Sequence, residues 1–131
     1  MNAPKQTDVT FEEINQRIWK HLVERDWQNN AARGTVISIV LEATELLEHY
    51  QWGDNPIGDK EDLAEELADI FIYAFEFAQT QDIDIATAIV AKLAKAAKKY
   101  PAEQFKGKAA ADKRQAWLDA KIKHREQKKG L

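Results

Sequence analysis

Hydrophobic side chains recur every three or four residues through most of this chain, which is the spacing of amphipathic helices. In the first such segment, Ile14, Ile18 and Leu22 share one face. Thr10 and Glu13 have the spacing of a capping box, which favours a helix start directly after Thr10. No segment shows the alternation of a β-strand, so the pattern predicts an all-helical protein.

The later helical segments are separated by residues that favour turns or end helices. We expect a second helix over about residues 34–52, followed by the loop "GDNPIGD" and a third helix that Asp59 caps. A fourth helix begins after Asp82 or Asp84 as its cap and stops at Pro101, because proline disrupts a helix interior. The connections between all these segments are short.

The predicted helices divide the chain into three parts. Residues 1–9 are expected to form an N-terminal tail, residues 10–108 a helical domain, and residues 109–131 a short basic C-terminal helix or tail. Four helices with short connections favour an antiparallel four-helix bundle. The third helix is apolar on several faces, so we expect the bundle to assemble as a dimer or a tetramer.

Composition and charge exclude several classes of protein. The 131 residues carry a formal net charge of −3, which argues against a nucleic-acid-binding protein with its basic field. There is no cysteine, and hence neither a disulfide nor a thiolate metal site. No apolar run approaches the roughly 20 residues that span a bilayer, and no apolar signal-peptide core follows Met1. We therefore expect a cytoplasmic protein without membrane or nucleic-acid partners.

Two acidic pairs lie inside apolar helical sequence. Glu42 and Glu45 belong to the second predicted helix, and Glu66 and Asp69 to the third. The i, i+3 spacing places both carboxylates of a pair on one helix face. A buried carboxylate either takes up a proton or finds a partner, because burying an unpaired charge is costly. A hard divalent cation, Mg²⁺ or Mn²⁺, would satisfy both pairs through oxygen ligands.

The same acidic pairs also permit a simpler interpretation. A single E-x-x-E pattern is common on solvated helices, because Glu favours helices. The chain would then be a non-catalytic helical protein-interaction module whose carboxylates lie in water. His49 follows Glu45 by four residues instead of the three of a ferritin-like di-iron site, so we interpret it as a polar neighbour. The residues alone leave both interpretations open.

Three segments carry a resemblance to a known family. "EATELLEHYQW", "EELADIFIYAFEFA" and "AKLAKAAKKYP" resemble the all-α nucleoside triphosphate pyrophosphohydrolases of the MazG-like group, especially the branch of the dCTP pyrophosphatases. The resemblance extends over about residues 26–108. The E-x-x-E and E-x-x-D motifs of that family match Glu42, Glu45, Glu66 and Asp69. The resemblance implies an oligomeric four-helix bundle that hydrolyses nucleoside triphosphates to monophosphate and pyrophosphate with Mg²⁺.

The resemblance also implies roles for individual residues. Glu42 and Glu45 would act in catalysis as well as in metal binding, and Glu45 is the candidate general base. Trp27 and Trp52 match tryptophans that line the base pocket of the dCTP pyrophosphatases, where aromatic rings stack on bases. The residues expected to bind the triphosphate, with a solvated basic face as the alternative, are Lys92, Lys95, Lys99 and Tyr100.

The chain departs from the family near the expected nucleoside pocket. Ala96 stands where relatives usually carry Asn, and "QNNAARG" replaces a His-containing linker. Alanine cannot replace the hydrogen bonds of an Asn amide. We therefore expect broad nucleotide acceptance with a preference for pyrimidine deoxynucleotides, and a role in clearing pyrimidine or non-standard nucleotides.

Overall fold

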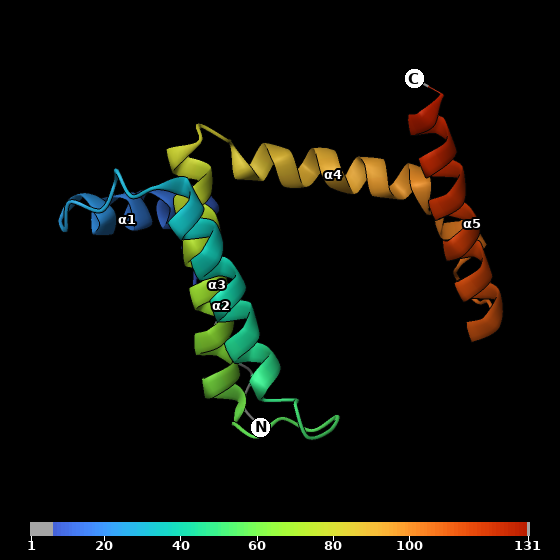
Figure 1. Cartoon of the computed structure of the whole chain (residues 1–131), viewed down its shortest axis with the longest axis horizontal. Coiled ribbons are helices and arrows are strands. Elements are labelled where there is room, and N and C mark those ends of the chain that lie inside the picture. Colours follow the sequence, from blue (N-terminus) through green and yellow to red (C-terminus); the bar gives the residue numbers. More distant parts are fainter. Residues whose placement is uncertain (1–6, 131) are drawn as a thin grey trace. The chain divides into compact units, whose positions relative to one another are not determined.

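The computed structural model describes residues 7–130, and every regular element in that range is helical (Figure 1). The elements are α1 (Phe11–Val23), α2 (Ala32–Glu48), α3 (Lys60–Thr80), α4 (Ile85–Lys99), the short 3-10 helix η1 (Ala102–Gln104) and α5 (Ala110–Lys129). The predicted all-helical class is confirmed over this range. Of the predicted tail 1–9, residues 1–6 lie outside the described residues. None of the described helices is long and apolar enough to cross a membrane.

The chain forms two compact units, Met1–Ile85 and Ala86–Leu131. In the first unit α2 and α3 lie side by side, and α1 contacts α3 (Figure 1). The second unit contains most of α4 together with η1 and α5. The predicted acidic pairs thus fall in one unit, and the predicted phosphate-binding residues fall in the other.

The core of the first unit lies where α1 meets α3. Ile18, Leu22 and Phe75 are buried together there, and Ile85 packs against them. The ring of Phe11 lies 4.8 Å from that of Phe75, measured between centroids. The apolar face predicted for the first helix is therefore the face that α1 presents to α3.

Polar side chains cap the starts of α1 and α3. The hydroxyl of Thr10 accepts a hydrogen bond from the backbone N–H of Glu13 at 3.2 Å. Asp59 and Asp62 form a reciprocal capping box at the start of α3, with two backbone-to-carboxylate bonds of 2.9 Å. Asp84 directly precedes α4. The predicted helix starts after Thr10 and Asp59 are confirmed.

The second helix ends earlier than predicted. α2 stops at Glu48, and residues 49–52 form turns, so Trp52 lies outside the helix. The chain reverses here because the carbonyl of His49 accepts a hydrogen bond from the N–H of Ile57 at 2.8 Å. This contact crosses the loop and cannot be read from helical periodicity.

The C-terminal helix is longer than predicted. α5 spans 20 residues, from Ala110 to Lys129. Its alanines and long charged side chains favour a helix. Side chains one turn apart support it: Gln115 donates to Asp119 at 2.8 Å, and the Lys121 ammonium lies 4.1 Å from the ring centroid of Trp117.

Candidate metal centre

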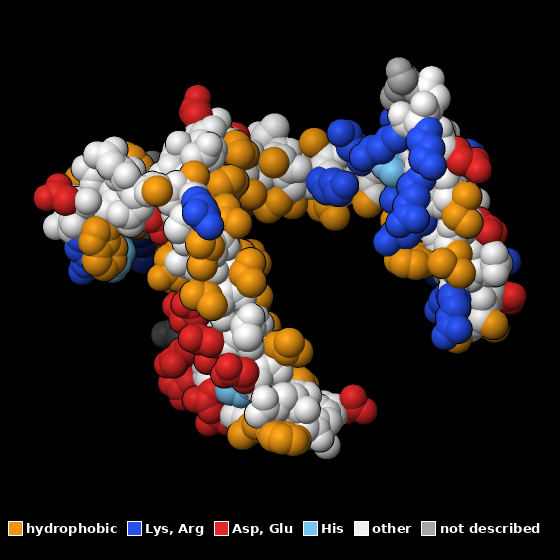
Figure 2. All heavy atoms as spheres, in the orientation of Figure 1, with side chains coloured by type: hydrophobic (Ala, Val, Ile, Leu, Met, Phe, Trp, Pro, Cys, Tyr) orange, Lys and Arg blue, Asp and Glu red, His pale blue; other side chains and the backbone are white. Residues whose placement is uncertain are grey.

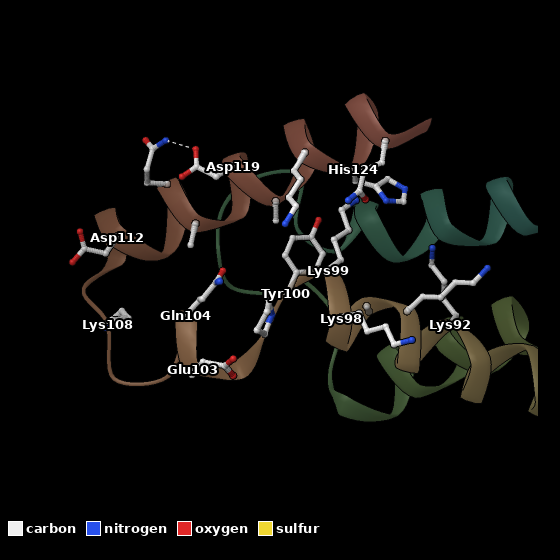
Figure 3. Close-up of a pocket in the computed structure, with 18 residues that line it drawn as sticks. Lys92, Lys98, Lys99, Tyr100, Glu103, Gln104, Lys108, Asp112, Asp119 and His124 are labelled. Atoms are coloured by element: carbon white, nitrogen blue, oxygen red, sulfur yellow. Dashed lines mark hydrogen bonds between the residues drawn. The ribbon is translucent and has the colours of Figure 1, made fainter. Parts of the chain in front are cut away.

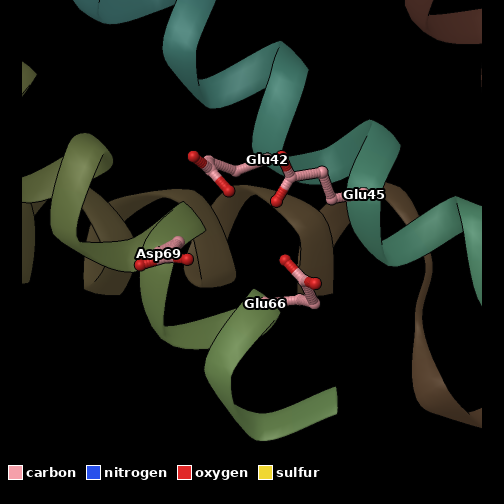
Figure 4. Close-up of side chains that lie close together, drawn as sticks. All are labelled: Glu42, Glu45, Glu66 and Asp69. Carbon is pink, nitrogen blue, oxygen red and sulfur yellow. The ribbon is translucent and has the colours of Figure 1, made fainter. Parts of the chain in front are cut away.

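The two predicted acidic pairs meet between α2 and α3. Glu42 and Glu45 extend from α2 toward Glu66 and Asp69 on α3 (Figure 4). One carboxylate oxygen from each of the four residues lies within 4.8 Å of the others. The i, i+3 spacing aligns the two carboxylates of a pair on one face, and the packing of the two helices brings the faces together.

The cluster concentrates negative charge in a partly buried place. Glu42 and Glu66 are partly buried, whereas Glu45 is exposed. Burial raises the pKa of Glu42 above its usual value, and the neighbouring carboxylates, Glu45 first, act in the same direction. Burial and Glu45 likewise raise the pKa of Glu66, while His49 acts in the opposite direction. Without a cation, the surroundings of Glu42 and Glu66 therefore oppose the ionisation of these two side chains.

One oxygen of this cluster lacks a partner. The Oε2 atom of Glu42 is buried and makes no hydrogen bond. Such an atom has lost its contact with water and gained nothing in exchange, which is costly. A divalent cation would supply the missing interaction. The four residues offer only oxygen ligands, which fit Mg²⁺ or Mn²⁺ better than zinc.

The acidic face of α3 serves different purposes along its length. Asp62 belongs to the capping box at the helix start, and Glu66 and Asp69 belong to the cluster. Glu76, about two turns further along the same face, is only 4 % exposed and accepts a hydrogen bond from the side chain of Asn30 at 3.3 Å. The contact to Asn30, in the connection before α2, was not predicted because the two residues lie far apart in the sequence.

A histidine lies directly beside the cluster. The Nε2 atom of His49 is 3.6 Å from Oε1 of Glu66. Its Nδ1 atom accepts a hydrogen bond from the backbone N–H of Gly58 at 3.1 Å. His49 was correctly predicted to be a polar neighbour of the acidic pairs, but its contact with Gly58 was not predicted.

The predicted phosphate-binding residues surround a hollow of about 1100 Å³ in the second unit (Figure 3). The ones that line it are Lys92, Lys95, Lys99 and Tyr100. Ala96, the position that departs from the family, lines it too, and α5 adds Lys123 and His124. Burial and nearby lysines, Lys99 first, lower the pKa of His124. Residues 109–131 were predicted to form a short basic helix or a tail, and their contribution to this hollow was not predicted.

Charge is divided unequally between the two units. Residues 86–131 hold 13 of the 19 Lys and Arg residues but only 4 of the 22 Asp and Glu residues. Figure 2 shows the basic side chains gathered on α4 and α5 and an acidic group along α2 and α3. The small net charge of the chain therefore conceals an acidic first unit and a basic second unit.

The two predicted base-binding tryptophans lie outside the helices. Trp27 follows α1 and is 47 % exposed, with its ring centroid 6.0 Å from that of His21. Trp52 is 84 % exposed in the turns after α2. The prediction that the second helix extends to Trp52 is therefore wrong, because α2 ends at Glu48. Neither tryptophan lines the basic hollow, and their role in binding a base stays a prediction.

A helix pair with four clustered carboxylates defines an all-α protein with an oxygen-ligand centre suited to a divalent cation. Residues 37–112 match the sequence model of the MazG-like family, and the chain belongs to this family. It is 30 % identical over 104 residues to dCTP pyrophosphatase 1 from Homo sapiens. The matched region covers 72 % of this chain and 61 % of that relative. The predicted resemblance is thereby confirmed, although the chain spans less than two thirds of that relative's length.

A solved structure gives a second likeness. The crystal structure of a pyrophosphatase from Archaeoglobus fulgidus superimposes with a TM-score of 0.61 at 26 % sequence identity. The match covers 76 % of this chain and 99 % of that one. The helical arrangement described above is thus similar to one that experiment has determined.

Proposed function

We propose that this protein is a nucleoside triphosphate pyrophosphohydrolase that uses Mg²⁺, with Mn²⁺ as an alternative, to release monophosphate and pyrophosphate. The observation that carries the proposal is the cluster of four carboxylates within 4.8 Å between α2 and α3. Membership of the MazG-like family supports it. The names of the two relatives, a dCTP pyrophosphatase and a pyrophosphatase, support it as well.

The proposal assigns metal binding to the carboxylate cluster. The proposed ligands are Glu42, Glu45, Glu66 and Asp69. A bound Mg²⁺ supplies charge neutralisation for phosphate oxygens and makes a coordinated water more acidic. Glu45 is the candidate base, and its exposed carboxylate is accessible to a water molecule. Both residues would thus serve in catalysis.

The proposal assigns the negatively charged phosphates to the basic hollow of the second unit. Lysine ammonium groups neutralise phosphate, and a tyrosine hydroxyl can donate a hydrogen bond to it. The proposed binding residues are Lys92, Lys95, Lys99 and Tyr100. Trp27 and Trp52 are proposed to stack on the base. A substitution of Lys99 by Ala should therefore weaken substrate binding, as measured by a higher KM.

The proposed substrates are pyrimidine deoxynucleoside triphosphates, including non-standard ones. Ala96 lines the hollow and offers no hydrogen-bonding group to a sugar or base. Losing one such bond changes affinity by about 0.5–1.5 kcal/mol, which is at most about tenfold. We therefore propose broad acceptance. Ala96→Asn should raise preference for one base about tenfold, whereas Ala97→Asn, at a position that does not line the hollow, should leave it unchanged.

The assembly is also part of the proposal. A four-helix bundle forming dimers or tetramers would cover apolar side chains that one chain leaves exposed. On α2, Val40 and Leu41 are 59 % and 57 % exposed, and on α3, Leu67 and Phe71 are 48 % and 53 % exposed. A second copy of the chain would remove this apolar surface from water, which is favourable.

A product assay in ¹⁸O-labelled water tests the proposed reaction. The wild-type protein is incubated with Mg²⁺ and a panel of dCTP, dUTP, dTTP, dATP, dGTP and CTP. We expect nucleoside monophosphate and pyrophosphate as products. Release of labelled orthophosphate would show attack at the terminal phosphorus and contradict the proposal. Absence of turnover with every nucleotide would instead favour the helical interaction module.

A further inference from the structure

The end of α2 and the loop before α3 are joined through the side chain of His49. The ring is only 15 % exposed, and its two nitrogen atoms face different partners. Nδ1 accepts the hydrogen bond from the backbone N–H of Gly58 at 3.1 Å, and Nε2 lies 3.6 Å from Oε1 of Glu66. The imidazole therefore lies between the loop and one member of the carboxylate cluster.

The hydrogen bond from Gly58 determines which nitrogen of His49 carries the proton. A nitrogen that accepts a hydrogen bond has no proton of its own, so the proton of the neutral imidazole is on Nε2. That N–H faces the carboxylate of Glu66. His49 thus presents an N–H donor to the carboxylate of Glu66.

Gly58 is required for this placement of the ring. A Cβ atom at this position would lie 2.5 Å from Cε1 and 2.7 Å from Nδ1 of His49, and 2.8 Å from Oδ2 of Asp62, which is closer than such atoms approach. The carbonyl of His49 also accepts a hydrogen bond from the N–H of Ile57, the residue before Gly58, at 2.8 Å. Asp59, which follows Gly58, begins the capping box of α3. The loop is therefore fixed to His49 directly before α3 begins.

The carboxylate of Glu66 needs such a constraint. It lies among like charges that repel it, and a Glu side chain has several rotatable bonds. A donor that contacts a ligand from outside the metal site restricts its orientation, and losing such a partner typically lowers metal affinity about 10–100-fold.

We propose that His49 is a positioning residue that directs the carboxylate of Glu66 toward the metal centre, and that Gly58 fixes the His49 ring for this purpose. The inference rests on the proposed metal centre, and His49 acts on that centre through Glu66. It differs from the simpler interpretation, in which His49 only stabilises the turn after α2. Two variants separate the alternatives, because the two ring nitrogens have separate partners.

His49→Asn keeps an acceptor near the Nδ1 position for Gly58 but is too short to reach Glu66. His49→Gln is one methylene longer and can extend an N–H donor to Glu66. Mn²⁺ alone, without nucleotide, is titrated into each full-length variant, and free Mn²⁺ is measured by electron paramagnetic resonance. His21→Leu, an exposed position on α1, serves as the control.

We expect His49→Asn to bind Mn²⁺ about 10–100-fold more weakly than wild type and His49→Gln to recover most of that loss. The metal-free melting temperatures of the two variants should be similar. Gly58→Ala keeps the imidazole but displaces it, and it should also weaken binding. If His49→Asn does not fold, Gly58→Ala takes its place, and an unchanged circular dichroism spectrum shows that the nearby Asp62 cap of α3 is intact.

The possible failures are distinguishable. If wild type binds no Mn²⁺, the proposed metal centre is wrong and this inference is wrong with it. If wild type binds Mn²⁺ and His49→Asn binds equally well, only the positioning role is overturned. The same holds if His49→Gln binds as weakly as His49→Asn.

Discussion

Adjacent carboxylates on α3 have different surroundings at the scale of single residues. Glu66 is partly buried in the cluster and faces both Glu45 and His49, whereas its neighbour Glu65 is exposed and lies outside the cluster. The difference follows from helix geometry, because successive side chains point about 100° apart. Chemistry at this site should therefore depend on Glu66 and be insensitive to Glu65.

Neutralising one carboxylate of the cluster should remove activity. We expect Glu66→Gln or Asp69→Asn to lower kcat/KM by a hundredfold or more, equivalent to about 2.7 kcal/mol, because one anionic metal ligand is lost. Glu65→Gln is the matched control and should retain wild-type turnover. Near-normal activity of either cluster variant at saturating Mg²⁺ would eliminate the four-carboxylate site.

The raised pKa values predict how the metal-free protein responds to pH. Folding raises the pKa of Glu42 and Glu66 above the usual value of 4.5, so the folded state binds protons more tightly than the unfolded chain. The stabilisation is fully present below pH 4.5 and is lost as pH rises through the raised values. In a metal chelator, the melting temperature of wild type should therefore fall relative to that of Glu66→Gln as pH increases from 4.5.

Differential scanning calorimetry at several pH values measures this difference in melting temperature. At neutral pH, added Mg²⁺ should raise the melting temperature of the wild-type protein again. The titration of Asp59 changes stability with pH in the opposite direction, and it does so at lower pH. The backbone N–H of Asp62 lowers its pKa, so its stabilisation is lost as pH falls below the usual 3.8. Melting temperatures of wild type and Glu66→Gln that change equally with pH would contradict the predicted effect of the raised pKa values.

Helix α3 is the element on which the first unit is built. Its start is fixed by Asp59, its middle faces α2 through the carboxylate cluster, and its C-terminal half packs against α1 through Phe75. Phe71, one turn before Phe75, is 53 % exposed in the single chain, whereas Phe75 is 5 % exposed. The same residue type therefore contributes to two different surfaces of one helix.

Truncating the buried phenylalanine should destabilise the first unit strongly. We expect Phe75→Ala to lower the free energy of unfolding by about 3–5 kcal/mol, because it removes a buried ring and leaves a cavity. Chemical denaturation monitored by circular dichroism measures the change. Phe71→Ala is the matched control and should cost less in a monomer. Equal losses for the two variants at a concentration where the protein is monomeric would place Phe71 in the same core.

The whole molecule combines an acidic first unit and a basic second unit, and it leaves many apolar side chains uncovered. Six large apolar residues on α2 and α3 are about half exposed or more in one chain: Ile37, Val40, Leu41, Leu47, Leu67 and Phe71. Apolar surface of this kind marks an interface more often than a free surface. The oligomeric state is therefore the property of the whole molecule that most needs measurement.

The protein should be at least a dimer at micromolar concentration. Multi-angle light scattering should give a mass of at least twice the 15.0 kDa of one chain. Replacing Phe71 and Leu67 by Ser should shift this mass toward the monomer, because it removes apolar area from the proposed interface. A monomer mass for the wild-type protein would contradict the assembly.

Local interactions allowed the sequence to determine the helices, the starts after Thr10 and Asp59, and the i, i+3 pairing of the carboxylates. Each depends on residues within a turn or two of one another. Only the tertiary structure decided which acidic face meets which, and it separated Glu76 from the cluster by giving it Asn30 as a partner.

The loop after α2 shows the physical reason for this limit. Helical periodicity extends through Trp52, but the hydrogen bonds that join His49 to Ile57 and Gly58 turn the chain away after Glu48. The hollow between α4 and α5 likewise depends on side chains more than 20 positions apart, such as Lys99 and Lys123. Short-range pattern determined which residues could act in this protein, while long-range packing determined which of them meet.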